Sequence, residues 1–388
     1  MKAFVANAQW APQSGYRLTS QEQENKRAVC GNKVWKNPFF TMTDIPIPDV
    51  GDHEVLVQTK SCGICGSDSH LYETDKDDYI IFSGPVRLPC IIGHEYAGII
   101  KKTGRKVRNF STGDPVTGES IIWCGQCTSC RSGAPNQCSR AELAGITVNG
   151  ALAEYMVVHE RQLWKIEKIA SVADDISLFD LGALIEPIGC AYNGLFISGG
   201  GFLPGSIVVV YGAGPIGLGA VALAYLAGAS KVFVFDRIAK RLEIAAKLGA
   251  TKTWNIDELK AANISPAQIV LENTGGHGAD IQVEAAGAAH RTIPEMEASL
   301  ATNGTIVYLG RTGKAASLTL DGMVTGATGI IGARGHAGYG IFPNIIQLIS
   351  SGRLDLKEMI TSCLPFSETL QALKQSVTKQ DGKILIHI

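Results

Sequence analysis

The stretch that decides the fold is Ser206-Ile207-Val208-Val209-Val210-Tyr211-Gly212-Ala213-Gly214-Pro215-Ile216-Gly217. Residues 206–211 form an apolar, β-branched run that is typical of a buried strand. Three glycines follow in the spacing G-x-G-x-x-G, and an apolar segment that we expect to be helical continues to residue 227. A strand, a glycine loop and a helix in this order are the context in which the motif binds a dinucleotide. The sequence therefore predicts a Rossmann-type βαβ unit.

Each residue of the loop has a physical role in such a site. Gly212 permits the tight turn, Gly214 lets the backbone approach a pyrophosphate, and Gly217 lets helix and strand pack closely. Pro215 and Ile216 open the helix, whose unpaired N–H groups and positive dipole end attract the phosphates. A glycine turn without a ligand is the competing interpretation, and the complete strand–loop–helix context argues against it.

The choice between NAD and NADP depends on Asp236. This residue follows a second predicted strand, 231–235, and lies 24 residues after Gly212. A carboxylate at this point accepts hydrogen bonds from the ribose 2′-hydroxyl and repels a 2′-phosphate, which favours NAD. The adjacent Arg237 is a counterargument, because a guanidinium can accept the phosphate. We include Arg237 and Arg241 among the candidate cofactor-binding residues.

Strands and helices alternate around this unit, which predicts a doubly wound parallel sheet. The other predicted elements are a helix at 240–248, strands at 281–285, 305–309 and 329–333, and a helix at 342–350. Upstream, the Gly- and Pro-rich segment with short β-branched runs (54–59, 97–101) indicates an irregular, mostly-β domain. The last 54 residues are too few for a core of their own. The sequence therefore predicts an α/β protein. We expect a mostly-β catalytic domain at 1–190, a nucleotide domain at 191–334, and a tail at 335–388 that rejoins the first domain.

Four cysteines lie close together in the first domain: Cys124, Cys127, Cys130 and Cys138, in the spacing C-x2-C-x2-C-x7-C. Four thiolates complete a zinc tetrahedron and leave no open position, so we predict a structural zinc lobe at about 124–138. The lobe has few large apolar side chains, so metal binding would supply most of its folding free energy. An iron–sulfur cluster and a pair of disulfides are the competing interpretations.

A second set of metal-binding residue types is dispersed along the chain. Cys65, the pair His94-Glu95, and Glu186 offer thiolate, imidazole and carboxylate, which are the ligands of an open zinc site. Such a zinc ion acts as a Lewis acid on an alcohol oxygen. Taken singly, each residue is more simply a buried cysteine, a core histidine or a surface carboxylate. Beside a nicotinamide site, the combination predicts a catalytic zinc centre.

Two further residues suit proton transfer at this centre. Ser67 and His70 follow Cys65 within five residues. A hydroxyl beside the alcohol accepts its proton and passes it to a histidine nearer to solvent, which is general-base catalysis through a relay. We therefore predict a catalytic role for both.

Composition and charge exclude other classes of protein. Hydrophobic residues make up 45% and charged residues 18%, which argues against disorder. The net charge of -1 predicts neither nucleic-acid binding nor attraction to an anionic membrane. The longest apolar stretch, 215–229, is shorter than the roughly 20 residues of a membrane span, and no signal peptide is recognisable. We expect a cytoplasmic protein. A zinc-lobe interaction protein, or a nucleotide-binding scaffold without turnover, is a weaker hypothesis.

Together these motifs resemble the zinc-containing medium-chain dehydrogenase/reductase family. The matching pieces, in order, are Gly63-Ile64-Cys65-Gly66-Ser67-Asp68, Gly93-His94-Glu95, the four-cysteine lobe, Glu186-Pro187 and the glycine loop. The resemblance implies a GroES-like catalytic domain, a Rossmann domain, NAD, two zinc ions per chain and a homotetramer or homodimer. It implies Cys65, His94 and Glu95 as catalytic zinc ligands. Whether Glu186 binds zinc directly or through water stays open.

The resemblance also suggests a substrate class. Glu186-Pro187 is similar to the sorbitol and threonine dehydrogenase branch, whereas simple alcohol dehydrogenases carry a cysteine near this point; Cys190 lies close by. Residues 31–38, 73–79 and 335–343 resemble bacterial cyclitol oxidoreductases of the scyllo-inosose 3-dehydrogenase type. This implies a polyol or cyclitol substrate. An amino alcohol, such as threonine or an aminocyclitol, is the alternative, because the acidic segment 73–79 could attract an ammonium group.

One residue is a candidate for substrate contact. Arg334 directly follows the last predicted strand of the nucleotide sheet, and ligands bind beyond the carboxyl ends of such strands. Its guanidinium offers five donors in a fixed fork, which suits adjacent hydroxyls. A structural salt bridge is the alternative role.

Overall fold

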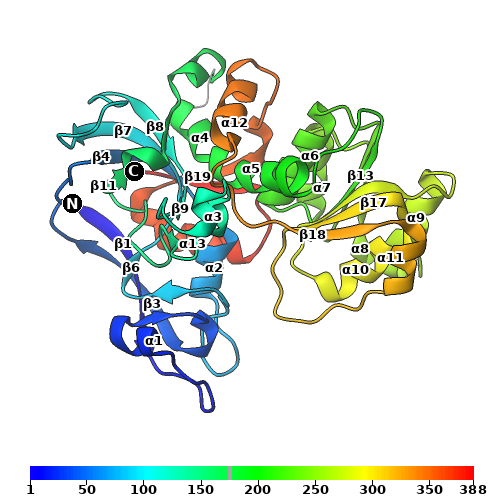
Figure 1. Cartoon of the computed structure of the whole chain (residues 1–388), viewed down its shortest axis with the longest axis horizontal. Coiled ribbons are helices and arrows are strands. Elements are labelled where there is room, and N and C mark those ends of the chain that lie inside the picture. Colours follow the sequence, from blue (N-terminus) through cyan, green and yellow to red (C-terminus); the bar gives the residue numbers. More distant parts are fainter. Residues whose placement is uncertain (174–176) are drawn as a thin grey trace. The chain divides into compact units, whose positions relative to one another are not determined.

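The structure, a computed structural model, describes residues 1–173 and 177–388 in two compact units (Figure 1). The first unit comprises Met1–Glu186, Ser362–Thr378 and Lys383–Ile388. The second comprises Pro187–Thr361 and Lys379–Gly382. The chain thus enters the second unit at Pro187, returns to the first unit at Ser362, and contributes four more residues, Lys379–Gly382, to the second unit before it ends in the first.

The first unit is built on a seven-stranded sheet in the order β12-β8-β7-β4-β20-β19, with β11 also paired to β4. Its strands are β4 (Glu54–Gly63), β7 (Glu95–Thr103), β8 (Pro115–Gly118), β11 (Tyr155–His159), β12 (Leu163–Lys165), β19 (Ile360–Pro365) and β20 (Lys383–His387). The central strand β4 pairs antiparallel with β7, β11 and β20. Pairing of β4 with β20 places the C-terminus in the first unit, as the sequence predicts. The mostly-β character expected for this part of the chain is confirmed.

Smaller elements complete the first unit. A three-stranded sheet joins β3 (Trp35–Asp44), β1 (Lys2–Trp10) and β6 (Cys90–Ile91), and two short pairs join β2 (Arg27–Ala28) to β5 (Val86–Arg87) and β9 (Ile121–Ile122) to β10 (Glu142–Leu143). The helices are α1 (Ser20–Asn25), α2 (Gly66–Tyr72), α3 (Thr128–Arg131), α4 (Leu178–Ala183) and α13 (Thr369–Val377). Short 3-10 turns are η1 (Gly31–Lys33), η2 (Pro135–Gln137), η3 (Glu160–Gln162), η4 (Glu167–Val172) and η7 (Phe366–Glu368). A large apolar core packs against most of these elements, and a smaller cluster contains Ala3, Ile91 and Ala153.

The second unit contains a six-stranded parallel sheet in the order β15-β14-β13-β16-β17-β18. Its strands are β13 (Ile207–Tyr211), β14 (Lys231–Asp236), β15 (Lys252–Asn255), β16 (Ala279–Glu284), β17 (Leu300–Tyr308) and β18 (Gly329–Gly332). Its helices are α5 (Ile185–Tyr192, which begins at the unit boundary), the π-helical η5 (Asn193–Ser198), α6 (Pro215–Leu226), α7 (Ala239–Lys247), α8 (Ile256–Ala261), α9 (Pro266–Asn273), α10 (Ala289–Ala298), α11 (Leu320–Gly326), α12 (Ile341–Ser350) and the turn η6 (Lys357–Met359). Figure 1 shows helices on both faces of this sheet. The doubly wound prediction is confirmed, and β13 lies between β14 and β16, where the strand order reverses.

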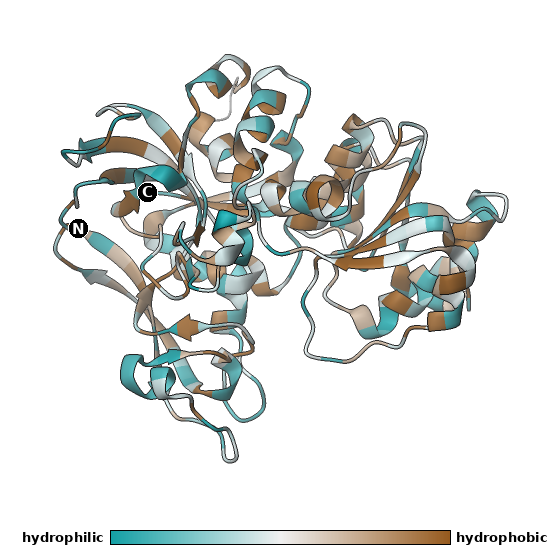
Figure 2. Ribbon diagram, viewed as in Figure 1, coloured by the Kyte–Doolittle hydropathy of each residue, from teal (hydrophilic) through white to brown (hydrophobic). Residues whose placement is uncertain are grey.

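Helix α6 follows β13 directly and is buried along most of its length. Gly214 is its N-cap and Pro215 its first residue, a position where the missing N–H of proline is tolerated. Hydrophobic residues, brown in Figure 2, occupy much of the sheet and helices of this unit. The glycine loop therefore lies at the carboxyl end of a rigid, apolar strand.

The point at which the chain returns differs from the predicted residue 335. Residues 335–361 group with the second unit, and the first unit resumes at Ser362. Helix α12 buries Ile341 and Phe342, and a Cβ added at Gly189 would meet the His336 side chain at 2.8 Å. Lys247 and Glu358 form an ion pair at 2.8 Å. These contacts join the segment to α5 and α7, which no local pattern in the tail indicates.

The helical stretch Leu178–Ser198 is long and apolar enough to cross a membrane by length and composition alone. The polar residues Asp180, Glu186 and Asn193 interrupt it, so the uninterrupted apolar stretch 215–229 is the one that stands out in the sequence. Its apolar window is 72% buried within the protein. That degree of burial is what a core helix of a globular protein shows.

Candidate functional site

The predicted catalytic residues Cys65, His94 and Glu95 come together in the first unit. Cys65 is the N-cap of α2, just after β4, and Glu95 begins β7. The two strands pair in a register that places Gly63 opposite Glu95. One ligand atom from each of the three residues lies within 4.8 Å of the others. Thiolate, imidazole and carboxylate are zinc ligands, and three of them leave a coordination position for a substrate oxygen.

Asp68 supports this trio, although the sequence reasoning assigned it no role. The Cys65 backbone N–H donates to Asp68 Oδ2 at 2.9 Å, and Asp68 Oδ1 lies 3.8 Å from His94 Nδ1. Burial raises the pKa of Asp68, whose side chain has no solvent exposure. For His94, burial is the largest single effect and opposes the charged form, but Asp68, Cys65 and Glu186 together outweigh it, so the pKa of His94 is raised. Asp68 is three residues after an N-cap, which is the position of a capping-box carboxylate, so that pattern was available as a signal.

Lys383 is a second residue that the sequence did not single out. It is 1% exposed, and its Nζ donates to Glu95 Oε2 at 2.5 Å and to the Ile64 carbonyl at 3.1 Å. Burial is the largest single effect and lowers the pKa of Lys383, but Glu95, Cys65 and Glu186 together outweigh it, so the pKa is raised. A Cβ at Gly63 would lie 2.2 Å from Glu95 Oε2, so any larger residue there would displace the Glu95 carboxylate. A buried lysine thus offsets the buried carboxylate of the trio.

The other predicted catalytic residues are Ser67, His70 and Glu186. Ser67 Oγ is 3.3 Å from His94 Nε2. His70 is half-buried one turn later on α2. Glu186 is buried, accepts a hydrogen bond from Ser120 Oγ at 2.8 Å, and contributes to the raised pKa of His94. Glu186 is not one of the three residues whose ligand atoms group together, so the structure does not place it as a direct ligand.

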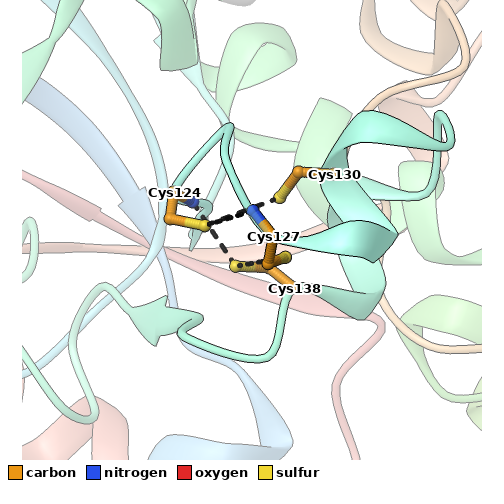
Figure 3. Close-up of side chains that lie close together, drawn as sticks. All are labelled: Cys124, Cys127, Cys130 and Cys138. Carbon is orange, nitrogen blue, oxygen red and sulfur yellow. Dashed lines mark hydrogen bonds between the residues drawn. The ribbon is translucent and has the colours of Figure 1, made fainter.

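The four cysteines of the lobe converge on one point (Figure 3). Cys124 Sγ is 4.0 Å from Cys130 Sγ, and Cys127 Sγ is 3.8 Å from Cys138 Sγ. With Zn–S bonds of about 2.3 Å, the edge of a tetrahedron is about 3.8 Å. All four are free thiols, so the pair of disulfides does not describe this site.

Backbone groups of the lobe stabilise the thiolates of Cys124 and Cys127. Backbone N–H groups of Gln126 and Cys127 donate to Cys124 Sγ, each at 3.4 Å. Backbone hydrogen bonds from Cys130 and Ser139 lower the pKa of Cys127 to about 5. Thiolates are the metal-binding form of cysteine, so the lobe fits a structural zinc ion.

Arg140 is expected to retain the metal in this lobe. Its Nη2 lies 3.3 Å from Cys124 Sγ, and a donor to a ligating sulfur strengthens metal binding. We expect Arg140→Ala to lose zinc to a chelator about tenfold faster than the wild type. The measurement is zinc release followed with a colorimetric chelator. Arg131→Ala, an exposed arginine of the same lobe, is the control; equal acceleration in both variants would contradict a specific role for Arg140.

The glycine loop of the second unit has the geometry that a pyrophosphate site needs. Gly212 has a φ of +96°, and a Cβ there would lie 2.6 Å from the Ala286 nitrogen. A Cβ at Gly217 would lie 1.8 Å from the Gly212 carbonyl oxygen, so helix and strand approach as closely as glycine allows. At Gly214 the nearest atom to a Cβ, Arg241 Nη1, is 3.7 Å away. Space therefore remains beside Gly214, where a phosphate would approach, and Pro215 and Ile216 begin the helix.

Asp236 ends β14 and is tied to this loop. Its Oδ2 accepts a hydrogen bond from the Ala213 N–H at 2.6 Å, and its Oδ1 accepts one from the Ile238 N–H at 2.8 Å. A carboxylate oxygen has two lone pairs, so these bonds leave capacity for hydroxyl donors. The carboxylate is thereby held at the edge of the loop.

The two candidate arginines of the cofactor site both interact with other residues of the second unit. Arg237 Nε pairs with Asp257 at 3.0 Å on the surface. Arg241 Nε donates to the Asp381 carbonyl at 2.8 Å, and burial lowers the pKa of Arg241. The pairing of Arg237 with Asp257 reduces its availability for a 2′-phosphate.

Arg334 follows β18, which ends at Gly332 and not at the predicted residue 333. Its side chain is exposed, and its backbone carbonyl accepts a hydrogen bond from Asn193 Nδ2 at 3.1 Å. A second bond from the same amide, at 2.8 Å, holds the Gly335 carbonyl. The fold therefore fixes the backbone of Arg334 beyond the carboxyl end of the sheet.

Comparison with known proteins agrees with this geometry. Residues 51–168 match the family profile described as "Alcohol dehydrogenase GroES-like domain", and residues 215–351 match "Zinc-binding dehydrogenase". The scyllo-inosose 3-dehydrogenase of Thermotoga maritima is 34% identical over 97% of each chain. The L-threonine 3-dehydrogenase of Bacillus subtilis is 32% identical over 89% of this chain and 94% of its own.

The fold is shared as well. A solved Thermotoga maritima structure, described as an alcohol dehydrogenase, has a TM-score of 0.95 and 33% identity over 100% of both chains. Zinc and a nicotinamide dinucleotide are the cofactors of this family. The chain belongs to the zinc-dependent alcohol dehydrogenase family, with a GroES-like unit and a Rossmann unit, and is an oxidoreductase.

Proposed function

We propose that the chain transfers hydride between NAD and a secondary alcohol or ketone of a polyol or cyclitol. The observation that carries the chemistry is the trio Cys65, His94 and Glu95, which offers three zinc ligands and an open position. The substrate class rests on the 34% identity to a scyllo-inosose 3-dehydrogenase over nearly the whole chain. The alternative, an amino-alcohol substrate, is supported by the threonine dehydrogenase relative.

Residues of the first unit would bind the catalytic metal ion. Cys65, His94 and Glu95 would hold a catalytic zinc ion, with Glu186 as the candidate fourth ligand, directly or through water. When bound, zinc supplies a Lewis acid for the alcohol oxygen and NAD supplies the hydride acceptor.

The proton leaves by a separate route. Ser67 Oγ lies next to the trio, 3.3 Å from His94 Nε2, and is positioned to accept the alcohol proton. His70, one turn along α2, would pass the proton towards solvent. Asp68 places its charge 3.8 Å from His94 Nδ1, and Lys383 donates a hydrogen bond to the Glu95 carboxylate and favours its charged form against the burial that raises the Glu95 pKa.

We also make proposals about the structural metal ion, the location of the protein and its assembly. Cys124, Cys127, Cys130 and Cys138 would hold a second, structural zinc ion, which gives two ions per chain. We also propose a cytoplasmic homo-oligomer, a tetramer or dimer. Metal analysis of the purified protein tests the metal identity, because iron with a visible charge-transfer band would contradict a zinc lobe.

NAD should be preferred over NADP because the Asp236 carboxylate repels a 2′-phosphate. We expect Asp236→Ser to narrow the ratio of the two kcat/KM values by about tenfold or more, equivalent to roughly 1.4 kcal/mol. Steady-state kinetics with both cofactors gives the ratio. Equal kcat/KM values in the wild type would show that Arg237 dominates, and Arg237→Ala is the matched variant for that outcome.

Arg334 should contact the substrate. Truncation to alanine would leave substrate hydroxyls unpaired, which costs about 1–3 kcal/mol and raises KM or lowers kcat. Kinetics and a melting curve of Arg334→Ala separate this role from a structural one. An early-melting variant with a normal KM would contradict substrate contact.

The substrate class is tested with one panel: inositols, inososes, hexitols, threonine and simple alcohols, assayed by NADH formation or consumption. We expect the cyclic and linear polyols to give the highest kcat/KM. A higher value for threonine would favour the amino-alcohol alternative, and a higher value for ethanol would contradict both.

A further inference from the structure

A third group of metal-ligating side chains lies in the first unit, apart from the two proposed zinc sites. Asp180 is on helix α4, Cys363 is on strand β19, and His387 is on strand β20. The two strands are neighbours in the seven-stranded sheet. One carboxylate oxygen, one sulfur and one ring nitrogen lie within 4.8 Å of one another. Segments that are far apart in the sequence thus bring together three different ligand types.

The distances within this group fit a metal ion. His387 Nε2 is 3.0 Å from Asp180 Oδ1 and 3.2 Å from Oδ2. With Zn–N and Zn–O bonds of about 2.0–2.2 Å, the N···O edge of a tetrahedron is roughly 3.4 Å. A metal ion can therefore replace the shared proton with a small movement of the side chains. Thiolate, imidazole and carboxylate together favour zinc over a hard cation such as magnesium.

The group has one buried ligand and two exposed ligands, which suits a site whose metal ion exchanges with solvent. The Asp180 side chain is 7% exposed, whereas that of His387 is 49% exposed and Cys363 is exposed. The buried carboxylate fixes one ligand, and the other two meet an ion arriving from solvent. Three protein ligands leave a position for water.

We propose that Asp180, Cys363 and His387 form a third, exchangeable zinc site that ties the returning C-terminal strands to helix α4. The site would join residue 180 to residues 363 and 387, on strands that the chain reaches only after residues 187–361 of the second unit. An ion that binds only the folded state stabilises that state by mass action. The site shares no residue with the oxidoreductase centre, so this proposal does not depend on the proposed function.

The test is zinc stoichiometry of the zinc-loaded, full-length protein, dialysed against micromolar free zinc. We expect three ions per chain in the wild type and two in Cys363→Ser and in His387→Gln. The control is His277→Gln, which removes another exposed histidine that faces an aspartate, Asp280, at 3.6 Å but belongs to none of the metal-ligating groups among residues 1–173 and 177–388. This variant should keep three ions.

A second readout addresses the thiol itself. Zinc should slow alkylation of Cys363, followed by mass spectrometry, about tenfold or more in the wild type and not in His387→Gln. The rise in melting temperature that added zinc causes in the wild type should also be lost in His387→Gln. Two ions in the wild type, or a third ion that persists in both Cys363→Ser and His387→Gln, would overturn the proposal. Equal alkylation rates with and without zinc in the wild type would overturn it as well.

Discussion

Replacing Cys65 with serine is expected to reduce alcohol oxidation by about a thousandfold or more while NAD binding stays at the wild-type level. The thiolate is one of three ligands in the trio, and a serine hydroxyl is a poor zinc ligand at neutral pH. The glycine loop and Asp236 belong to the second unit, so their geometry does not depend on Cys65. Turnover kinetics and NAD titration by fluorescence give the two quantities.

Cys62→Ala is the matched control for this prediction. Cys62 is buried on β4 only three residues away, and burial raises the pKa of its thiol well above the ordinary value. It acts as a small apolar side chain and should be dispensable for turnover. Loss of NAD binding in Cys65→Ser would contradict the assignment of the two sites to separate units. Full activity in Cys65→Ser would contradict the catalytic metal centre.

Replacing Lys383 with methionine should destabilise the protein by about 3–5 kcal/mol, because it leaves the Glu95 carboxylate buried without its partner. Lys383 and Glu95 are each 1% exposed, so solvent cannot compensate for the lost charge. Activity should fall as well, since Glu95 is a proposed ligand. Denaturant unfolding of the zinc-loaded protein measures the free energy of unfolding.

Two further variants test whether the loss of stability comes from the unpaired Glu95 charge. Adding Glu95→Gln to Lys383→Met should recover much of the stability but not the activity, since the buried charge is then removed. Lys374→Met, an exposed lysine on α13, should unfold like the wild type. An unchanged unfolding free energy in Lys383→Met would show that the ion pair does not support the site.

The parts that the sequence predicts are those encoded locally. The strand, glycine loop and helix from residue 206 onward follow from β-branched residues and glycines in one short stretch. The four cysteines lie within 15 residues, so their spacing alone indicates a closed site. Cys65, His94 and Glu95 are separated in sequence, but β4 and β7 pair directly and bring them together.

The parts that the sequence does not predict depend on long-range contacts. Lys383 meets Glu95 across 288 residues, and nothing near Lys383 distinguishes it from a surface lysine. Ser120 contacts Glu186 across 66 residues in the same way. Helices α8 to α11 were not predicted, because no motif accompanies their short apolar faces. The return of the chain at residue 362 depends on packing of α12 against α5, which is tertiary information.

The most direct test of the central claim follows the hydrogen atom on the alcohol carbon. The zinc-loaded protein is given an inositol deuterated at its ring carbons, with NAD, and the reduced cofactor is analysed by mass spectrometry. The proposed hydride transfer predicts one deuterium in each NADH for each ketone formed, and none in the Cys65→Ser variant. Deuterium that appears in water instead, with ketone formed but unlabelled NADH, would contradict it.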